Sequence, residues 1–139
     1  MHRIKYIILL PFLLLSCSKD IPIHNYHETR DHLISWENIF KQQENDYLVY
    51  FYSERCGHCN QIKQDIINFY LEGSYSLYFV CSDMEVVLGP KKDLKGIDNI
   101  DDFYIFGTPF LIRILSYSVE SYYAGSVEVK GYISILNKN

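Results

Sequence analysis

Two cysteines separated by two residues are the part of the sequence best suited to chemistry. Cys56 and Cys59 enclose Gly57 and His58. The same spacing occurs in half of a zinc site, in haem attachment and in a redox pair that cycles between dithiol and disulfide. The sequence has no second such pair and no histidine after His58, and Asn60 stands where haem attachment requires histidine. These surroundings favour redox chemistry and predict no bound metal.

The residues around the pair predict that Cys56 begins a helix. Six consecutive apolar or aromatic residues at 47–52 are typical of a strand buried on both faces of a sheet. Apolar residues after Cys59 recur at helical spacing until Gly73. Because unpaired N–H groups and the helix dipole stabilise an anion at a helix N-terminus, Cys56 is the predicted nucleophile. Cys59, one turn further on, is the predicted resolving thiol.

Three neighbouring residues are expected to tune the pair. His58 can add a positive charge and a hydrogen-bond donor, and Arg55 places a second cation beside the site. Such surroundings lower the pKa of a cysteine thiol from about 8.5 into a range of roughly 3.5 to 7.5. Gly57 leaves the turn unhindered, so that the backbone of a substrate can come close.

The first sixteen residues have the pattern of a secretory signal. Arg3 and Lys5 precede an apolar run at 6–15, which is too short for a spanning helix of about twenty residues. The end of this leader resembles a bacterial lipoprotein signal, in which a small residue precedes a cysteine that becomes the lipidated N-terminus. We therefore expect residues 1–16 to be a signal peptide and Cys17 to carry lipid. An ordinary signal peptide with a spare thiol at Cys17 is the alternative.

The rest of the chain divides into a tether and one domain. Residues 17–30 are polar without a sustained period, as expected of a tether that holds a domain off a membrane. Residues 31–139 have the usual size of a single domain. Hydrophobic residues make up 48% of the sequence and aromatic residues 16%, which is enough for a packed core. The net charge of −4 argues against nucleic-acid binding, which requires a basic surface.

Strand and helix patterns alternate along this domain. Residues 75–81 predict a second buried strand, so that strand, helix and strand form one βαβ unit. The runs at 110–115 and 119–123 predict a hairpin, and a last helix begins after Gly125. Residues 82–106 contain glycine, proline and clustered charges, and we expect one or two short helices there.

From about residue 33 to its end, the chain resembles the thioredoxin family. The matching features are the buried strand, the Cys-Gly-His-Cys site, a Thr108-Pro109 pair that opens a strand about fifty residues later, and Gly125 before the last helix. Cys-Gly-His-Cys is the active-site sequence of protein disulfide isomerase domains. The resemblance implies a thioredoxin-like α/β fold, with a central mixed sheet of four to five strands and helices on both faces. It also implies a cis peptide bond before Pro109, with Thr108 and Pro109 binding the substrate.

The resemblance also implies an activity. The protein would be a thiol–disulfide oxidoreductase that acts on extracytoplasmic proteins by exchange through Cys56 and Cys59, with that disulfide as its redox group and no further cofactor. Its partners would be protein thiols or disulfides and a membrane redox protein, and a lipid anchor would hold it outside the cytoplasm in a bacterial cell envelope. Two alternatives stay open. One is a membrane-coupled disulfide reductase that uses the same residues in the other direction, and the other is a non-catalytic thioredoxin-fold lipoprotein with a static disulfide.

Three positions need separate interpretation. Thioredoxins carry a buried acid six residues before the first cysteine, thought to accept the proton of the deeper thiol, and Tyr50 stands there in this chain. Tyrosine is not a base at neutral pH, so Glu54 or a water must substitute, or mixed disulfides resolve slowly. Arg55 replaces the usual tryptophan of the family. Cys81 ends a predicted buried strand, and we expect it to be a core residue rather than a third regulatory thiol.

Overall fold

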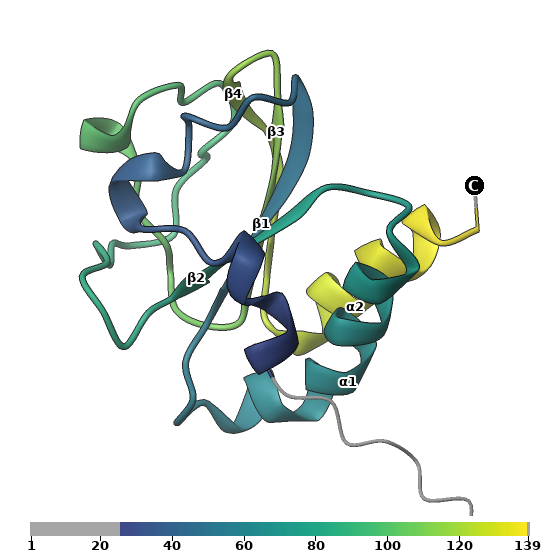
Figure 1. Ribbon diagram of the computed structural model, residues 1–139. Helices are drawn as coiled ribbons and strands as arrows, with labels where there is room; N and C mark the ends of the chain where they lie inside the picture. The colour runs from purple at the N-terminus through teal and green to yellow at the C-terminus, as the bar shows by residue number, and fades with distance from the viewer. Residues whose placement is uncertain (1–25, 139) are drawn as a thin grey trace, which may run out of the picture.

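The computed structural model describes residues 26–138, in which four strands form one mixed sheet in the order β2-β1-β3-β4 (Figure 1). The strands are β1 (Asp46–Tyr52), β2 (Leu77–Cys81), β3 (Phe110–Leu115) and β4 (Ser118–Ala124). β1 pairs in parallel with β2 and antiparallel with β3, and β3 pairs antiparallel with β4. All four predicted strands are therefore present, with small differences in where they begin and end.

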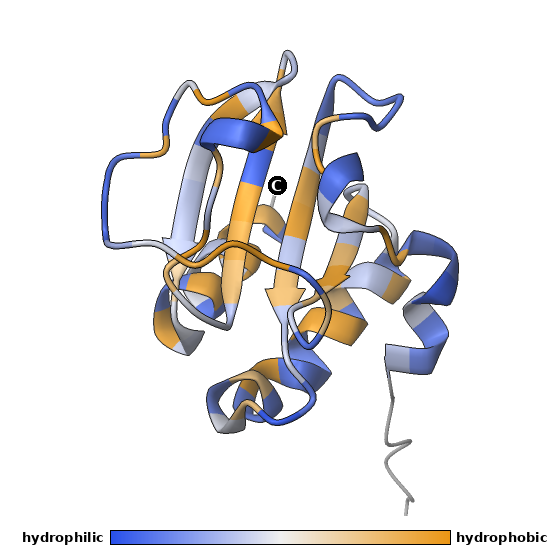
Figure 2. Ribbon diagram, turned by 90° about the vertical axis from the view of Figure 1, so that its left-hand side faces the viewer, coloured by the Kyte–Doolittle hydropathy of each residue, from blue (hydrophilic) through white to orange (hydrophobic). Residues whose placement is uncertain are grey.

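β1 lies inside the sheet because both of its faces are apolar. Leu48 and Tyr50 pack toward the two α-helices, whereas Val49 and Phe51 pack toward the opposite layer. All four side chains are fully buried. The hydrophobic colour along the inner strands in Figure 2 follows this double burial. The run of apolar residues thus directs the strand that leads to the cysteine pair into the middle of the domain.

The two α-helices lie side by side on one face of the sheet (Figure 1). α1 (Gly57–Glu72) begins after Cys56 and ends at Gly73, whose φ of 68° is in the left-handed region. α2 (Ser126–Leu136) begins after Gly125. Their apolar stripes meet the same hydrophobic cluster, and this packing fixes the direction of α1 relative to β1.

The opposite face carries short 3₁₀ helices and an irregular segment. The helices are η2 (Trp36–Asn38) and η3 (Ile100–Asp102), and the segment at 82–106 contributes Leu94 and Phe103 to the core. Helices thus lie on both faces, but α-helices lie on one of them only. The glycines and the proline of the irregular segment disfavour a longer helix there.

The folded domain begins before residue 31. η1 (Tyr26–His32) packs beside α1 and β2, and Tyr26 is buried with its ring stacked on Tyr52 at a centroid distance of 3.9 Å. Residues 26–30 therefore belong to the domain, because the ring of Tyr26 fills a site in the core. The remainder of the predicted tether, with Cys17 and the predicted signal, lies outside the described residues.

The free edge of β2 is partly covered by the chain that follows η1. Leu33 forms a parallel bridge with Phe79, and the backbone N–H of Ile34 donates to the Phe79 carbonyl oxygen at 2.9 Å. A single bridge thus takes the place of a fifth strand. Within residues 26–138, no helix combines the length and apolar character that crossing a membrane requires.

Candidate active site

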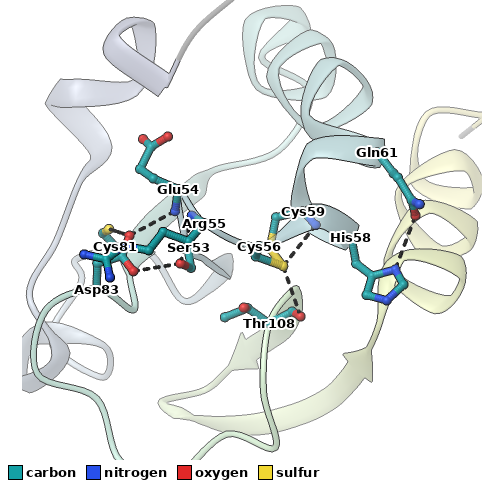
Figure 3. The surroundings of a disulfide bond; sticks show 10 residues. All are labelled: Ser53, Glu54, Arg55, Cys56, His58, Cys59, Gln61, Cys81, Asp83 and Thr108. Carbon is teal, nitrogen blue, oxygen red and sulfur yellow. Dashed lines mark hydrogen bonds between the residues drawn. A yellow bond between two sulfur atoms is a disulfide. The ribbon is translucent and has the colours of Figure 1, made fainter.

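Cys56 and Cys59 form a disulfide at the N-terminus of α1 (Figure 3). Their Cα atoms are 5.2 Å apart, and the backbone N–H of Cys59 donates to Sγ of Cys56 at 3.1 Å. Cys56 is half-buried, whereas Cys59 is fully buried. Cys56 therefore carries the sulfur that a substrate can reach, and Cys59 lies below it in the core.

The N-terminus of α1 favours a negative charge on Cys56. The helix has sixteen residues, and its first turn contains no acidic side chain that would repel a thiolate. The free N–H groups and the dipole of such a helix stabilise an anion by about 0.3 to 1 kcal/mol at an exposed end. Space is open beside Gly57, where an added Cβ would meet no atom within 4 Å.

The predicted proline loop lies against the disulfide. The Thr108-Pro109 peptide bond is cis, and the carbonyl oxygen of Thr108 is 3.3 Å from Sγ of Cys56. Pro109 is buried, and its carbonyl oxygen accepts a hydrogen bond from the N–H of Gly125 at 2.9 Å. β3 and the start of α2 therefore bring Thr108 to the reactive sulfur across a separation of 52 residues.

Asp83 holds the loop between β1 and Cys56, and sequence reasoning missed it. The Ser53 hydroxyl donates to one carboxylate oxygen at 2.7 Å, and the backbone N–H of Glu54 donates to the other at 3.0 Å. The hydrogen bond from the Ser53 hydroxyl is the largest cause that lowers the pKa of Asp83, and the hydrogen bond from the Glu54 N–H is the second. The predicted βαβ unit could have indicated this contact. Because β1 and β2 are parallel, the residues after their carboxyl ends must meet at one edge of the sheet.

Cys81 is half-buried at this edge rather than enclosed in the core. Its Sγ lies 3.7 Å from a carboxylate oxygen of Asp83. The pKa of the Cys81 thiol is raised, mainly because burial disfavours its charged form. Cys81 is therefore a poor nucleophile at neutral pH compared with a thiol at a helix N-terminus.

Arg55 and His58, which were predicted to tune the pair, are both exposed. The ring of His58 points away from the sulfurs in Figure 3, and its Nδ1 lies 3.4 Å from the side-chain oxygen of Gln61. Arg55 extends toward Asp83, and its charge helps to lower the pKa of that carboxyl group. Both residues flank Cys56 in the chain, but their side chains face other partners.

Tyr50, which stands where thioredoxins carry a buried acid, lies in the core below the pair. It is fully buried in the cluster that contains Cys59, and burial is the largest cause that raises its pKa. Its hydroxyl makes no hydrogen bond of ordinary geometry among the described residues, although the Tyr26 hydroxyl is close enough to raise its pKa. Tyr50 is thus a neutral side chain, and Glu54 is exposed with its carboxylate directed away from the disulfide (Figure 3).

Metal-ligating side chains do not gather in the described domain. Across residues 26–138, no three or more of its histidine, cysteine, aspartate and glutamate side chains are placed to hold a metal ion.

The fold and the site together define the class of structure. A mixed sheet in the order β2-β1-β3-β4, two α-helices on one face, and a C-x-x-C disulfide beside a cis-proline make this a thioredoxin-like fold. No model of a protein family matches the sequence, and no curated protein matches it.

The fold is similar to that of a solved thioredoxin at low sequence identity. The oxidized form of mitochondrial thioredoxin 3 from Saccharomyces cerevisiae aligns with a TM-score of 0.50 and 12% identity, over 74% of this chain and 92% of the yeast protein. Thioredoxin f2 from Chlamydomonas reinhardtii aligns with a TM-score of 0.49 and 13% identity, over 76% and 93% of the two chains. At this identity the likeness concerns the fold.

Proposed function

We propose that the protein is a thiol–disulfide oxidoreductase that exchanges disulfides with protein substrates through Cys56 and Cys59. One observation carries the proposal: a half-buried sulfur caps a helix N-terminus, with a fully buried partner cysteine one turn away. The thioredoxin-like fold and the cis-proline loop beside the sulfur add support. A purely structural disulfide would not need a helix N-terminus that stabilises its reduced form as a thiolate.

The exchange proceeds in two steps. The Cys56 thiolate attacks one sulfur of a substrate disulfide, forms a mixed disulfide and releases the other substrate sulfur as a thiolate. Cys59, which loses its proton to the released thiolate or to water, then attacks Cys56. The Cys56–Cys59 disulfide forms and the second substrate sulfur leaves, so the substrate gains two electrons and the protein loses two. The reverse sequence oxidises a substrate dithiol.

Turnover tests this proposal against a static disulfide. The wild type should accelerate reduction of insulin by dithiothreitol and reactivation of scrambled ribonuclease, and Cys56→Ala should do neither. The variant Cys81→Ser is the matched control, because Cys81 lies outside the disulfide, and it should keep the activity. If wild type and Cys56→Ala have the same rate as buffer, the protein is not an oxidoreductase.

We also propose that lipid on Cys17 holds the protein in a bacterial cell envelope, facing away from the cytoplasm. The support is the sequence: two cations, a short apolar run and a small residue before the cysteine. A single acyl chain anchors weakly, whereas two or three anchor stably. Wild type should enter the detergent phase on phase separation, and Cys17→Ser should stay in the aqueous phase. Equal partitioning would contradict the anchor.

A further inference from the structure

We propose that the protein prefers substrates with an acidic side chain close in sequence to the reacting cysteine, and that Lys91 selects them. The inference rests on the proposed disulfide exchange, and it names the class of substrate that the same site takes. It follows from the shape, the charge and the anchoring of one surface groove.

The groove runs beside the cis-proline loop. It consists of two adjoining hollows of 250 Å³ and 350 Å³ that share Lys91 and Phe106, and we call it the Lys91 groove. Thr108 and Pro109 line the smaller hollow. Because the Thr108 carbonyl oxygen lies 3.3 Å from Sγ of Cys56, a peptide whose cysteine is joined to Cys56 has this hollow next to it.

The Lys91 groove is positively charged. Its charged residues are Lys91, Lys92 and Glu128, which leave a net charge of +1 on a chain whose net charge is −4. The Glu128 carboxylate already accepts a hydrogen bond from the backbone N–H of Ala124 at 2.9 Å. Both lysines are exposed, and the ion pairs found among residues 26–138 do not include them. In the hollow beside the cis-proline, Lys91 is the only charged residue of the wall.

The backbone just before Lys91 is anchored even though its segment is irregular. The backbone N–H of Gly89 donates to the Ile105 carbonyl oxygen at 3.0 Å. The ring of Tyr104 covers Gly89 so closely that an added Cβ would lie 2.3 Å from it. Pro90 then fixes its own φ. The backbone of Lys91 therefore starts two residues from an anchored point.

The wall of the groove suits a side chain with an apolar stem. Phe106 packs edge-on against Phe110 and Tyr122, with ring centroids 5.2 Å and 5.9 Å away. A glutamate of the substrate can lay its methylene groups against this wall and place its carboxylate near Lys91. Glutamine has the same methylene groups without the charge, so a comparison of glutamate with glutamine isolates the electrostatic contribution.

Short disulfide-bonded peptides test the preference. Glutamate is placed in turn at four positions, which are the two before the cysteine and the two after it. Matched peptides carry glutamine or lysine at the same position. The reduced protein is mixed with each peptide, the reaction is quenched with acid, and the second-order rate constant is measured by chromatography. Lys91→Gln removes the charge and Lys91→Glu reverses it. Lys95→Gln is the control, because Lys95 belongs to the same segment but pairs with Glu120.

We expect the glutamate peptide to react roughly two- to fivefold faster than the glutamine peptide at one position or more, as a screened surface ion pair allows. Lys91→Gln should bring this ratio close to one, and Lys91→Glu should favour the lysine peptide. Lys95→Gln should leave the ratio unchanged. Equal rates for glutamate and glutamine at all four positions, or a ratio that Lys91→Gln does not alter, would overturn the inference.

The neutral reagent bis(2-hydroxyethyl) disulfide separates this inference from the proposed function. It has no charge for Lys91 to attract, so its rate with each variant measures only the general reactivity of Cys56 and shows that the variant is folded, and each peptide rate is divided by it. Reaction with this reagent but no charge preference among peptides would refute only the role of Lys91. If the reduced protein reacts with neither reagent nor peptides, the proposed oxidoreductase activity is refuted as well.

Discussion

The carbonyl oxygen of Thr108 lies 3.3 Å from Sγ of Cys56. The same sulfur accepts a hydrogen bond from the backbone N–H of Cys59 at 3.1 Å. These two contacts act in opposite directions when the disulfide is reduced. The N–H group stabilises a thiolate, whereas the carbonyl oxygen can accept a hydrogen bond from a neutral thiol but repels an anion. The reactivity of Cys56 therefore depends on the balance between α1 and the cis-proline loop.

The difference in exposure between the two cysteines predicts their separate roles. Cys59→Ala leaves the accessible nucleophile without its resolving partner, so mixed disulfides with substrate proteins should accumulate on a non-reducing gel. Of the pair, Cys56→Ala leaves only the fully buried thiol, and it should give almost none. Adducts with Cys56→Ala alone would reverse the assignment of nucleophile and resolving thiol.

Two tyrosines of β1 predict opposite effects of the same substitution. The Tyr47 hydroxyl donates to the Ile39 carbonyl oxygen at 2.7 Å, whereas the Tyr50 hydroxyl is buried and makes no hydrogen bond of ordinary geometry among the described residues. Tyr47→Phe removes a hydrogen bond and leaves a buried carbonyl unsatisfied, so the free energy of unfolding should fall by about 1 kcal/mol or more. Tyr50→Phe removes a hydroxyl that is costly to bury and whose neighbour is the Tyr26 hydroxyl, and it should leave stability unchanged or raise it by up to about 1 kcal/mol.

Urea denaturation of the oxidised protein measures this comparison, and each variant serves as the control for the other. Both side chains are fully buried in the same strand, so a general effect of losing a hydroxyl would move both midpoints alike. A loss of stability in Tyr50→Phe equal to that in Tyr47→Phe would indicate that Tyr50 makes a hydrogen bond essential to the core.

The elements that hold the cysteine pair were predictable because their signals are local. The apolar run of β1, the helical spacing of α1 and the glycine at 73 each specify structure within a few residues. The position of Thr108 opposite the pair came only from the family resemblance, since no local pattern brings two segments together across 52 residues.

The features that sequence reasoning missed depend on contacts between distant residues. Tyr26 is a single aromatic residue in a polar stretch, and no periodicity indicates that its ring fills a core site against Tyr52. Asp83 joins Ser53 across 30 positions, and its role requires the pairing of β1 with β2. Lys91 belongs to the clustered charges at 82–106, and only the folded chain places it beside Pro109.

The ion pair between Asp46 and Arg113 predicts a pH-dependent stability. Arg113 donates through Nε at 2.9 Å and Nη2 at 2.6 Å, and Tyr75 donates to the same carboxylate at 2.7 Å. The hydrogen bond from Arg113 is the main cause that lowers the pKa of Asp46 in the folded state. A lowered folded-state pKa stabilises the protein above the unfolded-state value of about 3.9, and this contribution disappears as the pH falls further.

Asp46→Asn should therefore lower the free energy of unfolding by about 1 to 2 kcal/mol at pH 7, with a smaller difference from wild type below about pH 4. Urea titrations at several pH values measure both quantities. Glu120→Gln is the matched control, because its pair with Lys95 spans 3.8 Å between exposed side chains and should contribute less than about 0.5 kcal/mol. A difference for Asp46→Asn that does not change between pH 7 and pH 3 would contradict the lowered pKa.

We expect His58 to influence the direction of the redox reaction. A positive charge near Cys56 stabilises the thiolate, and hence the reduced protein, which makes the disulfide a stronger oxidant. His58 is exposed and its ring lies beside Gln61, so its effect is limited by solvent. An ion pair between exposed groups contributes about 0.2 to 1 kcal/mol, which corresponds to roughly 4 to 20 mV for a two-electron couple. His58→Ala should therefore shift the potential by this amount in the reducing direction and raise the pKa of the Cys56 thiol.

Equilibration with glutathione buffers gives the potential, and thiolate absorbance near 240 nm gives the thiol pKa. Gln61→Ala is the control, because it removes the contact with the ring but keeps the imidazole, and it should change the potential less than His58→Ala. If His58→Ala keeps the wild-type potential and thiol pKa, His58 does not set them, and the case for an oxidising protein over a membrane-coupled reductase loses its main support.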